Sequence, residues 1–536
     1  MQVAWEPLRP NGRTDYAFLL KSNVREGSSV NSNWDRRSFL QLCSASMAWL
    51  TQAGRLAAKA APAQAANPSR AAGRKNFVAI QVKPFSWVDE GVDAVLDNIQ
   101  KKGNVNTIFA YTFDFEETRL KKNAATPLPD HGVEGGQLVG GAFYDYDPKY
   151  FEGTILKDFR SKDFGSFNVI EAVAPKAHAR GMDFFAWDYN NADPIMARHM
   201  TNIELVSEVD VYGRRTTSPC FNHPDYRTFL TGKVESELSG YANLVDGLCW
   251  GCERMGPINN MIGGGWTTNG ISCFCGYCQA KGRERGISVE RATIGYRKLD
   301  QLFTAAAKDQ RPADGYFVTF WRLLLEYPEI LAWEKLWTDS YHEVRAELYG
   351  AGKAIAPEKP FGFHIQQNMT FSPFYRAEEN YAETRHYADF LKLATYNNAG
   401  GPRLASFLDR LSATIFHDAK PEDFIGVYYK MMGHQEAAYG QLHLAGLSPN
   451  YVAEETKRAI AGTEGTVRIY PGIDIDVPTK PGDHRTKPDD VRAAIHAAFD
   501  AGANGVVLST RYEEMWLANL SAAGDALRDV FAHQQS

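Results

Sequence analysis

The sequence lacks several features that would place it in a common binding class. It has no extended run of Lys or Arg, and its formal net charge is −6. The first 65 residues carry 8 Lys and Arg against 4 Asp and Glu, so the remainder holds 50 against 60 and a charge of −10. A mildly acidic body without a basic run argues against nucleic acid and against an anionic membrane surface as partners.

Other motifs are also missing. No Gly-rich phosphate loop follows the first apolar segment of the globular part, which argues against a dinucleotide-binding sheet. The sequence has no H-x-H after that segment and no H-E-x-x-H, and this weighs against a metal-dependent hydrolase or isomerase. The apolar run Leu42 to Leu50 is too short to be a permanent membrane anchor, so we expect no stable membrane span.

The N-terminal segment resembles a twin-arginine export signal. Its core is Arg36-Arg37-Ser38-Phe39-Leu40, an apolar run follows, and Ala63-Gln64-Ala65 offers a cleavage site. Asp35 and Gln41 depart from the pattern at the flanking positions, and the alternative is a disordered N-terminus with a chance Arg pair. We predict an export signal at 1–65, a linker at 66–75, a catalytic barrel at 76–536, and a bacterial protein exported to the periplasm or the extracellular space.

Eight apolar segments alternate with helical patterns along the rest of the chain. Near-continuous apolar strands separated by helices indicate a parallel sheet, and eight repeats indicate a closed (β/α)8 TIM barrel, with an open doubly wound sheet as the alternative. The expected strands are Phe77–Val82, Val105–Phe113, Met182–Trp187, Leu244–Trp250, Pro360–Ile365, Phe390–Tyr396, Val467–Ile473 and Gly505–Leu508. The expected helices are Val88–Lys101, Val169–Arg180, Arg227–Leu238, Phe317–Tyr349, Glu378–Tyr387, Glu422–Leu444, Val452–Thr463 and Val491–Ala501.

Cysteines are few, seven in all, but three of them form a C-x-C-x2-C cluster at Cys273, Cys275 and Cys278. A structural zinc ion needs four ligands, so one further thiolate would complete the site. Cys220, Cys249 and Cys252 are the candidates for that fourth ligand. Disulfides formed after export are the rival interpretation, because six cysteines remain outside the leader.

The surroundings of these cysteines are similar to the β-galactosidases of glycoside hydrolase family 42. The similarity covers residues 215–280: a Cys before a helix start at Asn222-His223-Pro224-Asp225-Tyr226-Arg227, a strand that ends in a glutamate, and then C-x-C-x2-C. The resemblance implies that Cys220, Cys273, Cys275 and Cys278 bind a structural zinc ion. It also implies that Glu253 is the acid/base and that homo-oligomers are possible. The chain departs from the family at Cys252, where the family has an asparagine, and this leaves the sugar preference open.

In a (β/α)8 barrel, the catalytic groups lie at the C-terminal ends of the strands. The residues that follow the expected strands are rich in carboxylates, amides and aromatic rings, which suit the hydroxyl groups and ring faces of a neutral sugar. We therefore predict a carbohydrate substrate. The predicted substrate-binding residues are Trp187, Asp188, Trp250, His364, Asn368, Asn397, Arg403 and Glu513.

Glycoside hydrolysis requires a proton donor and a second carboxylate. We assign Glu253 as the acid/base, and we expect burial beside Trp250 or Trp266 to raise its pKa. No glutamate ends the seventh strand, so Asp474 and then Asp476 are the candidates for the second carboxylate, with Glu513 after the eighth strand as the third. A salt bridge between Glu253 and Arg254, or another cation at a strand end, is the structural alternative.

The sequence thus predicts a glycosidase that cleaves a glycosidic bond with Glu253 and a carboxylate on the seventh or eighth strand. Two alternatives stay open: a non-catalytic carbohydrate-binding barrel, which the missing strand-seven glutamate would favour, and a metal-dependent sugar hydrolase or isomerase. The sugar, the anomer and the oligomeric state are not determined at this point.

Overall fold

A computed structural model of the chain describes residues 76–115, 129–134, 138–190, 194–263 and 270–533. These residues belong to one compact unit, Pro68–Ser536. The predicted export signal and linker lie outside the described residues, as does Trp266. No helix in the described part has the length and apolar character that crossing a membrane requires.

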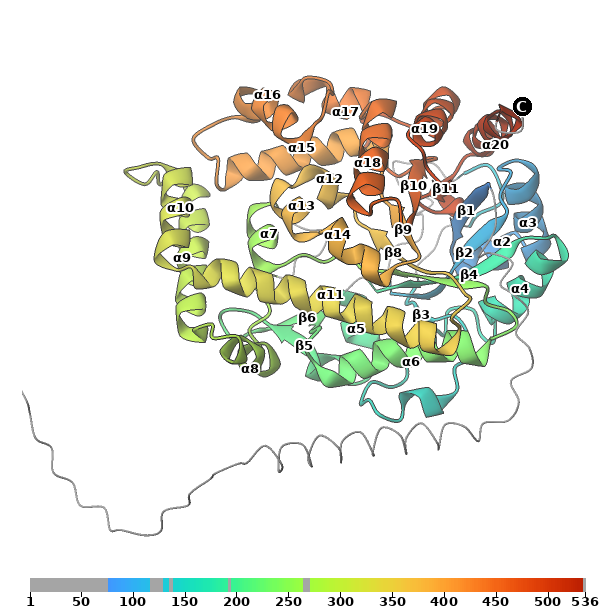
Figure 1. The fold of residues 1–536 in the computed structure, drawn as a ribbon, viewed down its shortest axis with the longest axis horizontal. Coiled ribbons are helices and arrows are strands. Elements are labelled where there is room, and N and C mark those ends of the chain that lie inside the picture. The colour runs from blue at the N-terminus through green and yellow to red at the C-terminus, as the bar shows by residue number, and fades with distance from the viewer. Residues whose placement is uncertain (1–75, 116–128, 135–137, 191–193, 264–269, 534–536) are drawn as a thin grey trace, which may run out of the picture. The chain divides into compact units, whose positions relative to one another are not determined.

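The core of the molecule is a closed barrel of eight parallel strands (Figure 1). Closure follows from β1, which pairs in parallel with both β2 and β11. This confirms the predicted (β/α)8 architecture. In barrel order the strands are β1 (Phe77–Val82), β2 (Thr107–Asp114), β4 (Asp183–Tyr189), β7 (Gly247–Gly251), β8 (Phe361–Ile365), β9 (Phe390–Leu393), β10 (Arg468–Asp474) and β11 (Gly505–Ser509).

Aromatic side chains fill the lower part of the barrel interior. Phe77 stacks on Tyr470 with ring centroids 4.0 Å apart, and Phe185 and Phe390 pack in the same cluster. Glycines on neighbouring strands make room for these rings, because a Cβ atom at Gly247 would lie 2.6 Å from the ring of Phe185. The interior is therefore a packed core, and chemistry is confined to its C-terminal end, here called the mouth.

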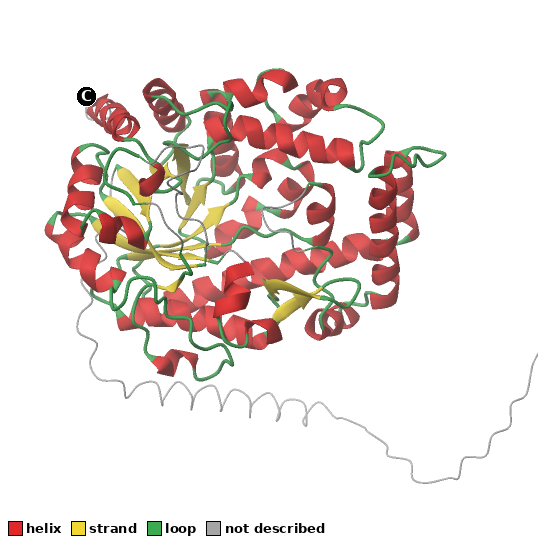
Figure 2. Cartoon of the chain, turned by 180° about the vertical axis from the view of Figure 1, so that it is seen from behind, coloured by secondary structure: helices red, strands yellow, loops and turns green. Residues whose placement is uncertain are grey.

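Helices surround the barrel, as Figure 2 shows. Most of the predicted helices are present within a few residues. The α-helices are α2 (Pro84–Asp89), α3 (Val92–Lys101), α4 (Val169–Ala179), α5 (Pro194–His199), α6 (Pro224–Gly240), α7 (Pro257–Ile262), α8 (Gly276–Glu284), α9 (Val289–Ala306), α10 (Tyr316–Glu326), α11 (Glu329–Ile355), α12 (Asn368–Phe371), α13 (Pro373–Glu378), α14 (Tyr381–Thr384), α15 (Asn397–Ala413), α16 (Pro421–Met432), α17 (Leu442–Ala445), α18 (Pro449–Gly462), α19 (Pro488–Asp500) and α20 (Leu517–His533).

Three predicted helices are interrupted, and in two of them the chain itself supplies a reason. The helix expected at 317–349 breaks between α10 and α11 at Pro328, because proline disfavours a helical residue before it. The helix expected at 422–444 ends at Gly433, which has a φ of 75° that closes α16. The segment 378–387 holds only short turns of helix.

Two of the strand-to-helix connections are long. The connection from β4 to β7 includes the antiparallel hairpin of β5 (Ser207–Val209) and β6 (Arg215–Pro219), followed by α6. The connection from β7 to β8 holds α7 to α11, and α11 alone has 27 residues. The cysteine cluster lies between these two insertions, so it ties together segments that are far apart in sequence.

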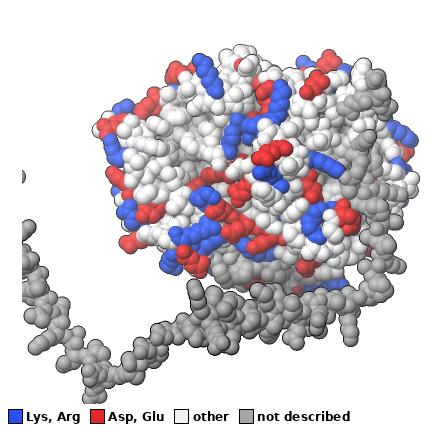
Figure 3. All heavy atoms as spheres, viewed as in Figure 1, with Lys and Arg blue, Asp and Glu red and all other residues white. Residues whose placement is uncertain are grey.

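On the face shown in Figure 3, acidic and basic side chains are interspersed. No extended patch of one sign is visible among the described residues on that face. This distribution is in keeping with the net charge of the sequence.

Candidate active site and thiol cluster

Glu253 follows β7 and points into the barrel mouth. Its carboxylate lies 2.7 Å from Nε2 of His364, which projects inward from β8. The Glu253 side chain is 15% exposed and that of His364 is 2% exposed, so the carboxylate borders the solvent while its partner forms the floor. Arg254, which the structural alternative would pair with Glu253, forms an ion pair with Glu208.

Several groups set the charge of Glu253. Burial alone would raise its pKa, but the hydrogen bond and charge interaction with His364 and the positive charges of Arg403 and Lys392 hold the pKa below its ordinary value. The expectation of a raised pKa beside Trp250 is therefore wrong. Trp250 points away from the mouth and packs against Tyr341, at a ring distance of 6.0 Å.

The pKa values of two nitrogen bases near Glu253, His364 and Lys392, are also shifted. Burial and the nearby Lys392 lower the pKa of His364 to about 4, so at neutral pH a neutral imidazole donates Nε2–H to the carboxylate. Burial lowers the pKa of Lys392 to about 7, although Glu253 and Cys249 oppose that shift. Lys392 projects inward from β9, donates a hydrogen bond to the hydroxyl of Tyr396, and lies 5.7 Å from the ring centre of Trp187.

The backbone on both sides of Glu253 is fixed. The hydroxyl of Tyr341 donates to the carbonyl of Cys252 at 2.8 Å, and the amide of Gln366 donates to the carbonyl of Arg254 at 3.0 Å. Arg254 is itself 1% exposed. A carboxylate held in this way is preorganised, as chemistry at the mouth would require.

Asp474, the first candidate for the second carboxylate, is fully buried at the end of β10. It accepts hydrogen bonds from the backbone N–H groups of Ala399, Asp476 and Val477 and from the hydroxyl of Thr486, at 2.9 to 3.2 Å. These four donors engage both carboxylate oxygens in holding together the end of β10 and the start of α15.

Asp476 makes contacts away from Glu253. One of its oxygens accepts from the backbone N–H of Trp516 at 2.9 Å and from the amide of Asn519 at 2.8 Å, which joins the loop to α20. Burial raises its pKa to about 7. Its φ of 127° lies where residues other than glycine are strained.

Glu513 lies on the opposite rim from Glu253. It belongs to the 3-10 turn Tyr512–Glu514 after β11, which is four strands from β7 in either direction around the barrel. Burial raises its pKa to about 7, with the charge of Glu514 adding to the shift, while Arg511 and Lys83 oppose it. Within the described part of the chain, neither carboxylate oxygen accepts a hydrogen bond, and Arg511 Nε lies 3.5 Å away.

Of the other predicted sugar-binding residues, three are buried away from the rim or beneath it. Asp188 faces outward from β4 and pairs with Lys233 of α6 at 2.7 Å, with both side chains fully buried. Trp187 faces inward but lies in the packed layer, 5.5 Å from Phe109. Asn397 is 2% exposed, and its carbonyl accepts from the backbone N–H of Leu447 at 2.8 Å.

A cleft of about 620 Å³ opens beside the mouth. Asn368 and Arg403, both predicted from the sequence, line it together with residues of α15 and of the loop after β10. Arg403 also donates a hydrogen bond to Gln367 at 2.7 Å, and its positive charge helps to lower the pKa of Glu253. The cleft and the carboxylate are therefore neighbours through Arg403, and we take them together as the candidate active site.

Four buried cysteines form a second centre. The sulfur atoms of Cys220, Cys273, Cys275 and Cys278 all lie within 4.8 Å of one another, and two of the separations are 3.5 Å. All six described cysteines are free thiols, so no disulfide joins any of them. Four thiolates at about 2.3 Å from a zinc ion would lie about 3.8 Å apart in a tetrahedron, and the observed separations could accommodate a metal ion.

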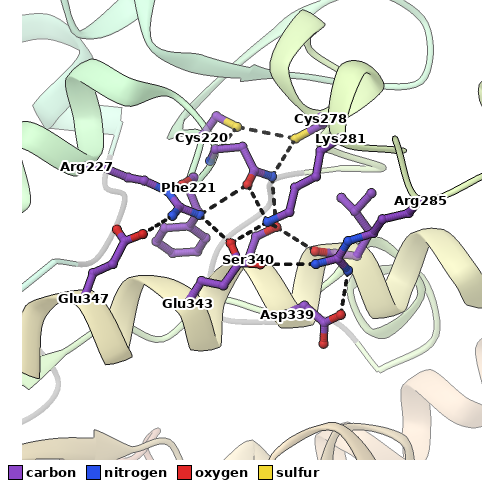
Figure 4. A network of polar contacts seen from close by, with 12 residues as sticks. Cys220, Phe221, Arg227, Cys278, Lys281, Arg285, Asp339, Ser340, Glu343 and Glu347 are labelled. Atoms are coloured by element: carbon purple, nitrogen blue, oxygen red, sulfur yellow. Dashed lines mark hydrogen bonds and ion pairs between the residues drawn. The ribbon is translucent and has the colours of Figure 1, made fainter. Parts of the chain in front are cut away.

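Polar groups around the cluster suit thiolates. The backbone N–H of Asn222 donates to the sulfur of Cys220 and its side-chain amide to that of Cys278, both at 3.3 Å. Figure 4 shows Lys281 next to Cys278, with Glu343 bridging Lys281 and Arg227. This network anchors the cluster to α6 and α11.

The thiol cluster is connected to the Glu253 loop. Arg254 donates to the carbonyl of Pro219 at 2.7 Å, directly before Cys220. Its partner Glu208 accepts from the hydroxyl of Ser272 at 2.7 Å, directly before Cys273. Two of the four cysteine positions are thus linked to the residue that follows Glu253.

Sequence reasoning missed Lys392 and Lys233. Lys392 stands in the apolar strand Phe390-Leu391-Lys392-Leu393, and a charged residue in an otherwise buried strand was an available signal. Lys233 gave no comparable signal, because a lysine in a predicted helix is ordinarily exposed.

Comparisons with known proteins define the fold. No protein-family model matches the sequence, and no curated protein matches it. Among solved structures, a β-galactosidase from the haloarchaeon Halorubrum lacusprofundi is 12% identical with a TM-score of 0.50, over 84% of this chain and 58% of that one. A β-galactosidase from Marinomonas ef1 is 10% identical with a TM-score of 0.49, over 86% of this chain and 60% of that one. The β-amylase catalytic domain from Paenibacillus polymyxa is 10% identical with a TM-score of 0.41, over 86% of this chain and 98% of that one.

Proposed function

We propose that the chain is a glycoside hydrolase that acts at the barrel mouth. The observation that carries the proposal is Glu253, a preorganised carboxylate at the end of the fourth barrel strand. Its side chain is 15% exposed, and its pKa is influenced by the charge of Arg403, which lines the cleft. The β-galactosidase from Halorubrum lacusprofundi shares the fold, and the chain spans 58% of its length. Activity and substrate are therefore inferred from the site and not from that likeness.

The electrostatics favour an ionised Glu253 at neutral pH. An ionised carboxylate can attack the anomeric carbon or activate a water molecule, whereas a proton donor needs a raised pKa. Glu513, with a pKa of about 7 and a place on the opposite rim, is the carboxyl group that suits the donor. In this assignment Glu253 is the nucleophile or base and Glu513 the acid, and the leaving oxygen takes the proton of Glu513.

Asp474 is the least suited of the predicted carboxylates. Its four hydrogen-bond donors stabilise the end of β10, and their loss would cost folding free energy. This engagement also favours the second candidate function, a carbohydrate-binding barrel without hydrolysis. A metal-dependent reaction has less support, because the thiol cluster is the one multi-ligand group found among the described residues.

We propose further that the thiol cluster binds a structural zinc ion through Cys220, Cys273, Cys275 and Cys278. The separations of the sulfur atoms and the N–H donors around them suit four thiolates. The ion would hold the segments before Cys220 and Cys273, and through Arg254 and Glu208 it would support the Glu253 loop. The export signal and a periplasmic or extracellular location remain part of the proposal.

A screen of aryl glycosides with the wild type and Glu253→Gln tests the hydrolase function. Glutamine keeps the shape of the side chain but can neither attack nor accept a proton, so we expect turnover to fall about 10²-fold or more. The change Glu235→Gln on α6, away from the mouth, serves as a control that should leave the rate unchanged. Equal rates in Glu253→Gln and the wild type would remove Glu253 from the reaction.

A further inference from the structure

We propose that the cleft beside Glu253 binds a saccharide that carries anionic groups, either carboxylate or sulfate. This inference rests on the proposed function and adds the substrate class. Its basis is the set of charged side chains in the cleft, Arg403, Arg410 and Lys480 against Asp409 and Asp483. The sequence had indicated a neutral sugar, but Phe407 is the one aromatic side chain among the residues that line the cleft.

The two arginines come from one face of α15. Arg403 and Arg410 are seven residues apart, which places them two turns apart, about 10 Å along the helix axis. The charge of Arg403 contributes to the lowered pKa of Glu253, and Arg410 lines the same cleft two turns farther along α15. This arrangement suits a short oligosaccharide that has its scissile bond at Glu253 and carries an anionic group at a distance from that bond.

Arg410 lacks a counter-ion in the described part of the chain. It is half-buried and donates only to the carbonyl and the hydroxyl of Ser406, at 3.3 and 3.2 Å. Burial lowers its pKa, although Asp409 opposes the shift. A guanidinium group that is partly desolvated and bonded to neutral acceptors would gain from an anionic ligand, which it can bind through two parallel hydrogen bonds.

The acidic groups of the cleft have partners of their own. Asp409 accepts a hydrogen bond from the hydroxyl of Tyr439. Asp483 accepts from the backbone N–H of Lys480 at 3.0 Å, and no ion pair of the Lys480 ammonium group is seen among the described residues. The cleft therefore carries three cationic side chains against two carboxylates, and each carboxylate already accepts a hydrogen bond.

Binding to the purified full chain tests the proposal without requiring hydrolysis. Calorimetry would compare three probes of equal length: an oligogalacturonate, a sulfated oligogalactan and a neutral oligogalactan. We expect at least one anionic probe to bind tenfold or more tightly than the neutral probe, with the preference falling as salt is raised. The two anionic probes separate carboxylate from sulfate recognition.

Variants of the cleft test whether its charged side chains cause the preference for an anionic probe. Arg410→Gln combined with Lys480→Gln should weaken the anionic probe tenfold or more and leave the neutral probe unchanged. Lys430→Gln, an exposed position on α16 outside the cleft, should change neither affinity. Circular dichroism would confirm that each variant is folded.

The outcomes distinguish this inference from the hydrolase function. Equal affinity for neutral and anionic probes, no binding of any probe, or an unchanged affinity in the double variant would overturn the anionic substrate class. Tight anionic binding without cleavage would keep the inference and overturn the hydrolase function. Cleavage of neutral glycosides alone would keep the hydrolase function and overturn the anionic substrate class.

Discussion

Glu253 follows β7 and Glu513 follows β11 on the opposite side of the barrel, and the pKa values of these two glutamates shift in opposite directions. Hydrogen bonding to His364 and two cations outweigh burial at Glu253, so its pKa falls. Burial and Glu514 outweigh two cations at Glu513, so its pKa rises to about 7. The pair shows that neighbours within a few ångströms, rather than burial as such, decide which carboxyl group can hold a proton.

The largest effect is expected from Glu513→Gln. If Glu513 is the proton donor, glycosidase turnover should fall about 10²-fold or more, with a smaller loss on aryl glycosides whose leaving groups need no proton. Glu454→Gln on the surface of α18, where Glu454 pairs with Lys457, provides the control and should retain full activity. Rates of Glu513→Gln equal to the wild type on every substrate would return the search to Asp476.

The next largest effect is expected at the thiol cluster. This cluster supports the loop of Glu253 but not the turn that carries Glu513. Cys278→Ser should remove bound zinc and lower the free energy of unfolding by several kcal/mol, because a structural zinc ion contributes directly to folding. Metal analysis and thermal unfolding would measure both. Cys252→Ala, outside the cluster, should keep the full metal content, and zinc retained in Cys278→Ser would contradict the assignment.

Asp474→Asn tests whether the third carboxylate is structural. The amide nitrogen of the asparagine would face N–H groups whose hydrogen bonds Asp474 now accepts. Because two donors would then oppose each other, we expect the free energy of unfolding to fall by about 3 kcal/mol. Urea unfolding would report the change. Asp489→Asn on α19, an exposed acid, is the control. A fully stable Asp474→Asn that had lost its turnover would instead give Asp474 a catalytic role.

The smallest effect is expected in the pH profile of Lys392→Met. In the proposed assignment, activity needs ionised Glu253 and protonated Glu513, so it should fall as pH drops through the lowered pKa of Glu253 and as pH rises through about 7. Removing the cation raises the pKa of Glu253, so the acid limb should move to higher pH. Lys430→Met should leave the profile unchanged, and an unmoved acid limb in Lys392→Met would exclude this influence.

The barrel could be predicted because its strands are encoded locally. All eight apolar segments became strands, since buried parallel strands require near-continuous apolar sequence. The start of α15 could not be predicted, because Gly400-Gly401-Pro402 is typical of a loop. A Cβ at Gly401 would lie 2.1 Å from the carbonyl of Leu442, so tertiary contact with α17 explains these glycines within a helix.

The site was predictable in part for the same reason. Cys273, Cys275 and Cys278 belong to one contiguous motif, and Cys220 joins them in the structure, where the four sulfur atoms lie within 4.8 Å of one another. Glu253 follows an apolar segment that became β7, and its catalytic role stays a prediction. Asp188 was placed at the mouth because it ends a strand, but its side chain points outward to Lys233. Alternation along a strand decides which side a residue faces, and a shift of one position reverses the outcome.

The early start of α15 has a consequence for how the protein can vary. Lys392, Tyr396, Arg403 and Arg410 come from a single stretch in which three residues, 394–396, separate β9 from α15. A change that slides or tilts this helix would alter the proton balance at the mouth and the charge spacing of the cleft at once. If the proposed site and cleft are correct, such a change would alter the ligand selectivity and the pH dependence of activity together.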